Sequence, residues 1–205
     1  MRLSVLIPTV TARASTLTRS LWYLQQQTGD FEVIVGTGDD IGLGDKTNAL
    51  IEAAAGEYFI IVDDDDYLPP NYMETVLPHL DGTFDYVGYR ILALHEGRYW
   101  LSIAHDANNP FEAFTLNRGV DKKMPIRRSL MDGLSLGNEF EDDWLFAKSI
   151  HDRVETSMFI DDHLYVYDWW PETMTFPGGH RDQGNWGPQR DIGRWPFDPE
   201  RARWI

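Results

Sequence analysis

The sequence predicts an α/β fold: a doubly wound, mostly parallel sheet with a smaller antiparallel portion. Two observations support this class. Short apolar runs alternate with helix-type segments over residues 1–80, and two strand-type runs then flank a tight turn at 95–97. Because crossovers between parallel strands are right-handed, the alternating order places helices on both faces of one sheet.

Three apolar runs predict the parallel strands: residues 3–8, 31–35 and 57–62. A helix is predicted after each of them, since leucines and other apolar residues recur there at helical spacing. The expected caps and first-turn residues are Ser15 or Thr16 for the first helix, Asp45 with Gly56 as the stop for the second, and Pro69 and Pro70 for the third.

The second half has a different pattern. Residues 85–94 and 97–105 predict paired strands, and 122–131 predict a further strand or turn. Residues 139–153 predict a helix with acidic residues in its first turn, where the helix dipole favours them. A late strand is expected over 163–170. No linker divides the 205 residues, so a single domain over 1–205 is expected.

Composition restricts the class of protein. The formal net charge is −15, which disfavours nucleic acid and anionic membrane surfaces as partners, although a local basic segment, "KKMPIRR", keeps nucleic acid open. No apolar run is long enough to span a membrane. There are no cysteines, which excludes disulfides and thiolate zinc sites and fits a cytoplasmic location.

Four aspartates, Asp63 to Asp66, directly follow the third predicted strand in "EYFIIVDDDDYLPP". Like charges at the end of a buried strand repel one another and lose hydration, so they need compensation. One interpretation is a solvated turn that caps the next helix. The other is a site for a hard divalent cation, because such ions prefer carboxylate oxygens and often bridge to phosphates.

Three segments in this order resemble a family-two glycosyltransferase with the GT-A fold: "LSVLIPTVTAR", "FEVIVGTGDD" and "KTNALIEAAAGEYFIIVDDDDYLPPNYME". The resemblance implies transfer of a sugar from a nucleotide diphosphate donor, with a UDP-sugar expected, to a hydroxyl acceptor of unknown class. It implies a nucleotide-sugar-binding half over 1–95, and an acceptor-binding half with a closing segment over 96–205. Mn²⁺ or Mg²⁺ is the implied cofactor.

The resemblance also assigns site residues. Asp65 is the implied direct metal ligand, Asp63 lies nearer the ribose and shares the metal site, and His180 is a further candidate metal ligand. The residues expected to line the donor nucleotide pocket are Pro8, Thr9, Arg13, Asp39, Asp40, Lys46, Asn48, Asp63 and Asp64.

An acidic pair that opens a helix and precedes an aromatic residue, in "EDDWLF", matches the family's catalytic base. Asp143 is the first candidate and Asp142 the second; the alternative role of Glu141 is only to favour the helix start through the helix dipole. Such a carboxylate takes the proton of the acceptor hydroxyl as its oxygen attacks the anomeric carbon, which inverts the configuration.

Two alternatives stay open from the sequence. A phosphatase of the haloacid dehalogenase type also places a DxD pattern after a buried strand, with its first aspartate as nucleophile. A non-catalytic nucleotide- or metal-binding module is the second.

The segment "KKMPIRR" is expected to meet the diphosphate or an anionic acceptor, or to offset nearby acids.

Overall fold

The computed structural model describes residues 1–111, 116–138 and 142–169, all within the unit Met1–Thr173. Its core is the predicted parallel sheet. Strand β1 (Leu3–Pro8) pairs in parallel with β2 (Phe31–Gly36) on one side and with β3 (Tyr58–Ile61) on the other. β1 and β3 are buried along their whole length, because central parallel strands are covered on both faces and therefore read as continuous apolar runs.

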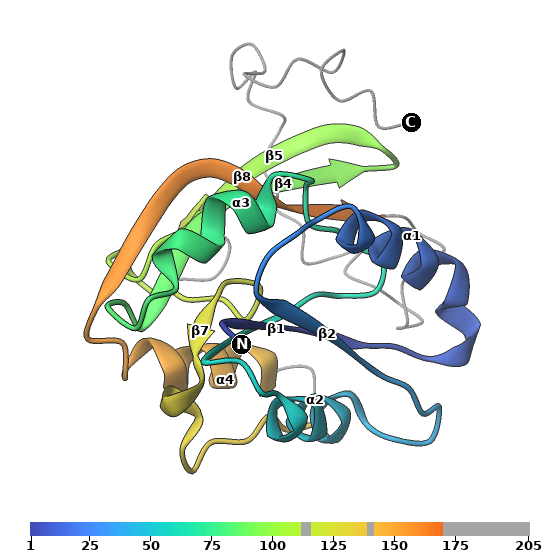
Figure 1. Ribbon diagram of the computed structural model, residues 1–205, viewed down its shortest axis with the longest axis horizontal. Helices are drawn as coiled ribbons and strands as arrows, with labels where there is room; N and C mark the ends of the chain where they lie inside the picture. Colours follow the sequence, from blue (N-terminus) through green and yellow to red (C-terminus); the bar gives the residue numbers. More distant parts are fainter. Residues whose placement is uncertain (112–115, 139–141, 170–205) are drawn as a thin grey trace, which may run out of the picture. The chain divides into compact units, whose positions relative to one another are not determined.

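Helices cover both faces of these strands. Helix α1 (Ala14–Gln25), which follows the short 3₁₀ turn η1 (Thr11–Arg13), and helix α2 (Leu43–Ala53) lie on opposite sides of β1 and β2 (Figure 1). α1 turns Leu24 and Tyr23 inward, and α2 turns Leu50 and Ile51 inward. The doubly wound arrangement predicted from the sequence is confirmed.

The rest of the sheet is mixed. Its strand order is β2-β1-β3-β7-β4-β5-β6, with β8 paired to β4. The pairs β3–β7, β4–β7 and β4–β5 are antiparallel, whereas β4–β8 and β5–β6 are parallel. The bounds of these strands are β4 Tyr86–His95, β5 Arg98–His105, β6 Asn117–Arg118, β7 Ile126–Arg127 and β8 Ser157–Trp169.

The predicted hairpin joins β4 to β5. Its two turn residues, Glu96 and Gly97, have φ values of 51° and 70°. A two-residue turn with both residues at positive φ matches the twist of the flanking strands, which is why this loop is short. The antiparallel portion expected in the second half is therefore confirmed. The late strand predicted at 163–170 is also present as β8, which begins earlier, at Ser157.

The predicted helix ends are less accurate. α1 begins at Ala14, before Ser15 and Thr16, and Arg13 holds the cap position without a side-chain hydrogen bond. Helix α3 (Tyr72–Val76), followed by the 3₁₀ turn η2 (Leu77–His79), begins after Pro69 and Pro70 rather than at them.

The caps predicted for α2 are wrong for a physical reason. The helix begins at Leu43, so Asp45 lies inside its first turn, and it ends at Ala53, before Gly56. The free N–H groups at its start donate instead to the side chain of Asn138, with distances to Oδ1 of 2.9 Å from Gly44 and 3.2 Å from Asp45. A distant residue replaces the local cap.

The remaining helices follow β7. The segment predicted as a strand or turn forms β7 and then the 3₁₀ helix η3 (Arg128–Met131). Helix α4 covers Asp142–His151, within the predicted range 139–153, of which 139–141 lie outside the described residues. Within the described ranges, no helix combines the length and apolar content needed to cross a bilayer.

Candidate active site at the carboxyl ends of the strands

The ends of β1 and β3 bring Thr9 and the aspartate run together. Thr9 is buried, and its Oγ1 donates to Oδ2 of Asp64 at 2.5 Å. Its backbone N–H donates to the carbonyl of Gly36 at the end of β2, at 2.8 Å. Ligand sites in open α/β sheets lie at this edge, beyond the carboxyl ends of the strands. Residues from the ends of β1 and β3 thus meet at this edge.

The four aspartates alternate between inside and outside. The side chains of Asp64 and Asp66 are 3% and 1% exposed, whereas those of Asp63 and Asp65 keep 32% and 19% of their surface accessible. The run turns back on itself through a bond from the N–H of Asp66 to the carbonyl of Asp63, at 3.0 Å. Two carboxylates therefore anchor the run and two face solvent.

Lys123 and β8 hold the inner side of the run. Nζ of Lys123 contacts Oδ2 of Asp63 and lies 3.2 Å from Oδ2 of Asp66. Tyr165 donates its hydroxyl proton to Asp66 at 2.7 Å, and the N–H of Asp168 donates to the other oxygen of Asp66 at 3.1 Å. Asp66 is thus satisfied as a buried carboxyl must be.

Two arginines approach the run from the first helical segment. Nε of Arg13 lies 2.8 Å from Oδ1 of Asp64, and Nη2 of Arg13 contacts Asp65. Arg19 forms an ion pair with Asp168 at 2.6 Å and donates to the backbone carbonyl of Asp65. The compensation that the aspartates need thus comes from cations of the same chain.

These neighbours separate the acidities of the aspartates. Burial alone would raise the pKa of Asp63, but the positive charges of Lys123 and Lys122 lower it to about 2. Burial raises the pKa of Asp66 to about 7 against the opposing charge of Lys123. Burial also raises the pKa of Asp64, against the hydrogen bond from Thr9. At neutral pH Asp63, which faces solvent, is therefore ionised.

Several predicted donor-pocket residues have structural partners. Nζ of Lys46 is buried and donates to the carbonyl of Thr9 at 2.5 Å. Asn48 uses both ends of its amide on the backbone of Leu136, at 2.8 Å each. Asp39 accepts the N–H of Thr11 at 2.8 Å. These side chains therefore order the loops around the site.

Pro8 and Asp40 complete the predicted set. Pro8 is the last residue of β1 and pairs with Gly36. Asp40 is exposed in the turn after β2. His180 and Glu141 lie outside the described residues. Asp142 and Asp143 form the start of α4, where the backbone alone is described.

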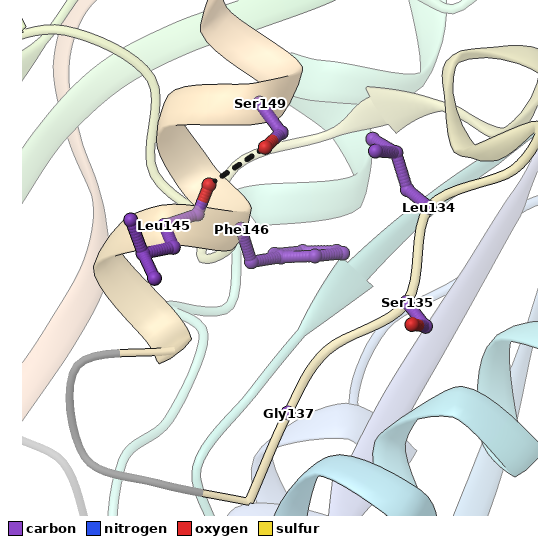
Figure 2. Close-up of a pocket in the computed structure, with 6 residues that line it drawn as sticks. All are labelled: Leu134, Ser135, Gly137, Leu145, Phe146 and Ser149. Atoms are coloured by element: carbon purple, nitrogen blue, oxygen red, sulfur yellow. Dashed lines mark hydrogen bonds between the residues drawn. The ribbon is translucent and has the colours of Figure 1, made fainter.

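A cavity of about 310 Å³ lies beside the first turns of α4 (Figure 2). One wall is the loop 134–137, and the other is α4, where Ser149 donates to the carbonyl of Leu145 at 2.9 Å. The lining residues are Leu134, Ser135, Gly137, Leu145, Phe146 and Ser149. Because Asn48 fixes Leu136, the loop wall is tied to α2.

The sequence reasoning did not name four residues that contact the aspartate run: Arg19, Lys123, Tyr165 and Asp168. Lys123 belongs to the basic segment "KKMPIRR", for which offsetting nearby acids was one expected role, and it has that role here. Asp168 carried a usable signal, since it is a charged residue directly after the run "LYVY" of β8. Arg19 gave none, because a basic residue on a surface helix is common.

The donor set was tested against the metal that the resemblance implies. Asp63 and Asp65 present accessible carboxylate oxygens, which suit Mg²⁺ or Mn²⁺. Among the residues that the structure describes, no three or more Asp, Glu, His or Cys side chains gather as a metal cage. The residues therefore fit an ion that takes one or two protein carboxylates and completes its shell with water and substrate phosphates.

Comparison with known proteins identifies the class. The family model described as "Glycosyl transferase family 2" matches residues 18–140, which is more than half of the chain. The chain therefore belongs to glycosyl transferase family 2. Membership of this family excludes the phosphatase of the haloacid dehalogenase type. Among curated proteins, none matches the sequence.

Solved structures show the same fold. Staphylococcus aureus TarS 1–349 in complex with UDP-GlcNAc is 18% identical with a TM-score of 0.68; the match covers 83% of this chain and 59% of that one. The mannosyltransferase PcManGT from Pyrobaculum calidifontis, in complex with GDP-Man and Mn²⁺, is 16% identical with a TM-score of 0.54, covering 80% and 56%. The chain thus spans about 60% of the TarS 1–349 structure.

Proposed function

We propose that this protein transfers a sugar from a nucleotide diphosphate donor, a UDP-sugar, to a hydroxyl acceptor with inversion at the anomeric carbon. The observation that carries the proposal is the alternation in the aspartate run, which turns Asp63 and Asp65 outward beside Thr9 and Arg13. The structural neighbours that bind UDP-GlcNAc and GDP-Man support a nucleotide-sugar donor.

In this proposal Asp65, with Asp63, holds a divalent cation, magnesium or manganese. When bound, the ion supplies positive charge that stabilises the phosphate oxygen as it leaves. Asp63 is ionised at neutral pH because Lys123 lowers its pKa, so it accepts hydrogen bonds from the ribose without losing a proton first. Asp64 and Thr9 fix the turn from inside.

The acceptor is placed at α4. Asp143, with Asp142 as the second candidate, takes the proton of the attacking hydroxyl. The cavity between α4 and the loop 134–137 adjoins the first turn of α4, and its mixed lining of Leu134, Leu145 and Phe146 with two serines suits the face and hydroxyls of a sugar-sized acceptor. The composition without cysteine supports a cytoplasmic location.

Thermal unfolding tests the donor half of the proposal. UDP, GDP and their sugars are added with and without Mn²⁺, and the true donor raises Tm by mass action. Asp65→Ala is expected to lose the rise that depends on Mn²⁺. Glu52→Ala, which removes an exposed acid from α2 outside the predicted donor pocket, separates a general loss of negative charge from loss of the metal ligand. A Mn²⁺-dependent rise that survives in Asp65→Ala contradicts the metal assignment.

Transfer assays test the base. Asp143→Asn is expected to keep the donor-induced rise in Tm and to lose transfer by a factor of about 10² to 10⁴, the usual contribution of a general base. Asp142→Asn provides the matched comparison one residue earlier in the same turn. Transfer that is unchanged in Asp143→Asn and lost in Asp142→Asn assigns the base to Asp142 instead.

A further inference from the structure

Two basic residues neutralise the aspartate run from opposite sides, and they are held very differently. Lys123 is 12% exposed, contacts Asp63, Asp66 and Tyr165, and lies 5.0 Å from the ring centre of Tyr165. A cation enclosed by so many partners belongs to the permanent structure. Arg13 is on the open side and is 20% exposed.

Arg13 contacts the outward carboxylate, Asp65. Its Nη2 touches Oδ2 of Asp65 while its Nε lies 2.8 Å from Asp64. A cation bound at the carboxylate of Asp65 would therefore lie next to a positive charge of the protein itself. A divalent ion and a guanidinium repel each other at such separations, so they compete for the carboxylate of Asp65.

The contact is close, but its geometry leaves donors unused. Nε and Nη2 of Arg13 are buried, yet neither donates a well-directed hydrogen bond to any residue in the described part of the chain. A guanidinium satisfies its N–H groups best on a phosphate or carboxylate that it meets edge to edge. Arg13 thus keeps hydrogen-bonding capacity for a second anion. Asp64 does not depend on Arg13, since Thr9 also holds it.

From these contacts we propose that Arg13 is an exchangeable counter-ion: it occupies Asp65 in the donor-free protein and passes to the donor's diphosphate when the cation takes its place. The inference rests on the proposed function. Its consequence is that the cation binds poorly alone and well with a nucleoside diphosphate, because the diphosphate supplies the new partner for Arg13. Coupling of this kind is reciprocal, so the cation strengthens nucleotide binding by the same factor.

Binding of Mn²⁺ alone, followed by electron paramagnetic resonance of the free ion, tests the first half. Arg13→Gln is expected to bind Mn²⁺ about tenfold more tightly than the wild type, within the range usual for coupled sites. UDP or GDP, added next, is expected to strengthen Mn²⁺ binding in the wild type and much less in Arg13→Gln. Arg13→Lys keeps the charge and is expected to remain close to the wild type.

The matched control is Arg90→Gln, which removes an arginine of similar exposure that pairs with Asp161 on a different part of the sheet. It should leave Mn²⁺ binding unchanged. Unfolding curves establish that each variant is folded, and Arg13→Met, which also removes the charge and keeps the length of the side chain, replaces Arg13→Gln if that variant is not. The inference is overturned if removal of Arg13 leaves the affinity for Mn²⁺ alone unchanged, or if Arg90→Gln raises it equally.

Failure of this inference differs from failure of the proposed function. If UDP and GDP bind with Mn²⁺ but Arg13→Gln leaves Mn²⁺ binding alone unchanged, only the role of Arg13 falls. If no nucleoside diphosphate binds the wild-type protein with or without Mn²⁺, the proposed donor falls, and the exchange with it.

Discussion

The aspartate run depends on individual charged residues that lie around it. Burial works against four neighbouring carboxylates, and this chain offsets that cost with Lys123 inside and Arg13 outside. The side chains that matter most to the run are therefore not acids. Because the two cations differ in enclosure, changes at each of them have different expected consequences.

Removing Lys123 is expected to lower stability. Lys123→Met keeps the length of the side chain and leaves Asp63 and Asp66 without their common ammonium, which typically costs about 3–5 kcal/mol when a buried pair is broken. Urea unfolding measures the loss. Lys148→Met, which breaks an exposed pair with Asp152 in α4, should cost no more than about 0.5 kcal/mol. Similar losses for both lysines would contradict the enclosed role of Lys123.

A buried histidine makes stability depend on pH. Burial lowers the pKa of His105, and the charges of Arg118 and Lys123 lower it further, against Asp121 at 3.9 Å. As pH falls below about 6.5, the unfolded chain takes up a proton that the folded imidazole does not, so the free energy of unfolding decreases.

Replacing His105 therefore flattens this dependence. His105→Gln is expected to show a smaller decrease in unfolding free energy between about pH 7 and pH 5 than the wild type, as measured by urea unfolding at each pH. His79→Gln, a change of a half-buried histidine in η2, serves as the control. An unchanged slope in His105→Gln would mean that another group titrates in this range.

At the scale of elements, the loop 134–138 lies between α2 and the cavity beside α4. Asn48 and Asn138 tie it to α2, and its other side forms the wall of the cavity at α4. The contact with α2 is close: a Cβ on Gly44 would lie 2.0 Å from the carbonyl oxygen of Gly137. Glycine is needed in this helix because backbone, not a movable side chain, occupies the space.

Gly44→Ala should thus destabilise the protein, although alanine usually stabilises a helix by about 1 kcal/mol relative to glycine. Overpacking against backbone is expected to cost about 1–3 kcal/mol and to shift the cavity wall, so transfer should fall as well. Glu52→Ala on the exposed side of α2 is the matched change and should stay within about 0.5 kcal/mol. If Gly44→Ala is more stable than the wild type, the loop 134–138 has moved to make room for the added methyl group.

The elements also show which features the sequence could predict. Apolar runs specified β1 and β3 because a strand covered on both faces needs no other signal, and the half-buried edge strand β2 has a similar run. The start of α2 was mispredicted because its cap, Asn138, is 94 residues away. Similarly, Asp63 and Asp65 follow from the motif, whereas Lys123 and Asp168 reach the run only through the pairing of β8 with β4 and the course of the chain before β7.

The whole molecule carries a formal net charge of −15. Such an excess destabilises the folded state through mutual repulsion, and dissolved ions screen it. We expect Tm to rise when NaCl increases from about 10 mM to about 150 mM, where the screening length shortens from about 30 Å to about 8 Å. A Tm that falls over this range would show that the internal ion pairs outweigh the overall repulsion.

Among the described strands, β8 is the last to be synthesised, and this affects how the chain folds on the ribosome. Tyr165 and Asp168 reach Asp66 across 99 and 102 positions of the chain, and Arg19 reaches Asp168 across 149. A nascent polypeptide that has not yet released these residues from the ribosome carries its acidic loop without half of the supporting framework. The sheet edge that carries the aspartate run is thus expected to be among the last regions to mature, because contacts between such remote positions form slowly.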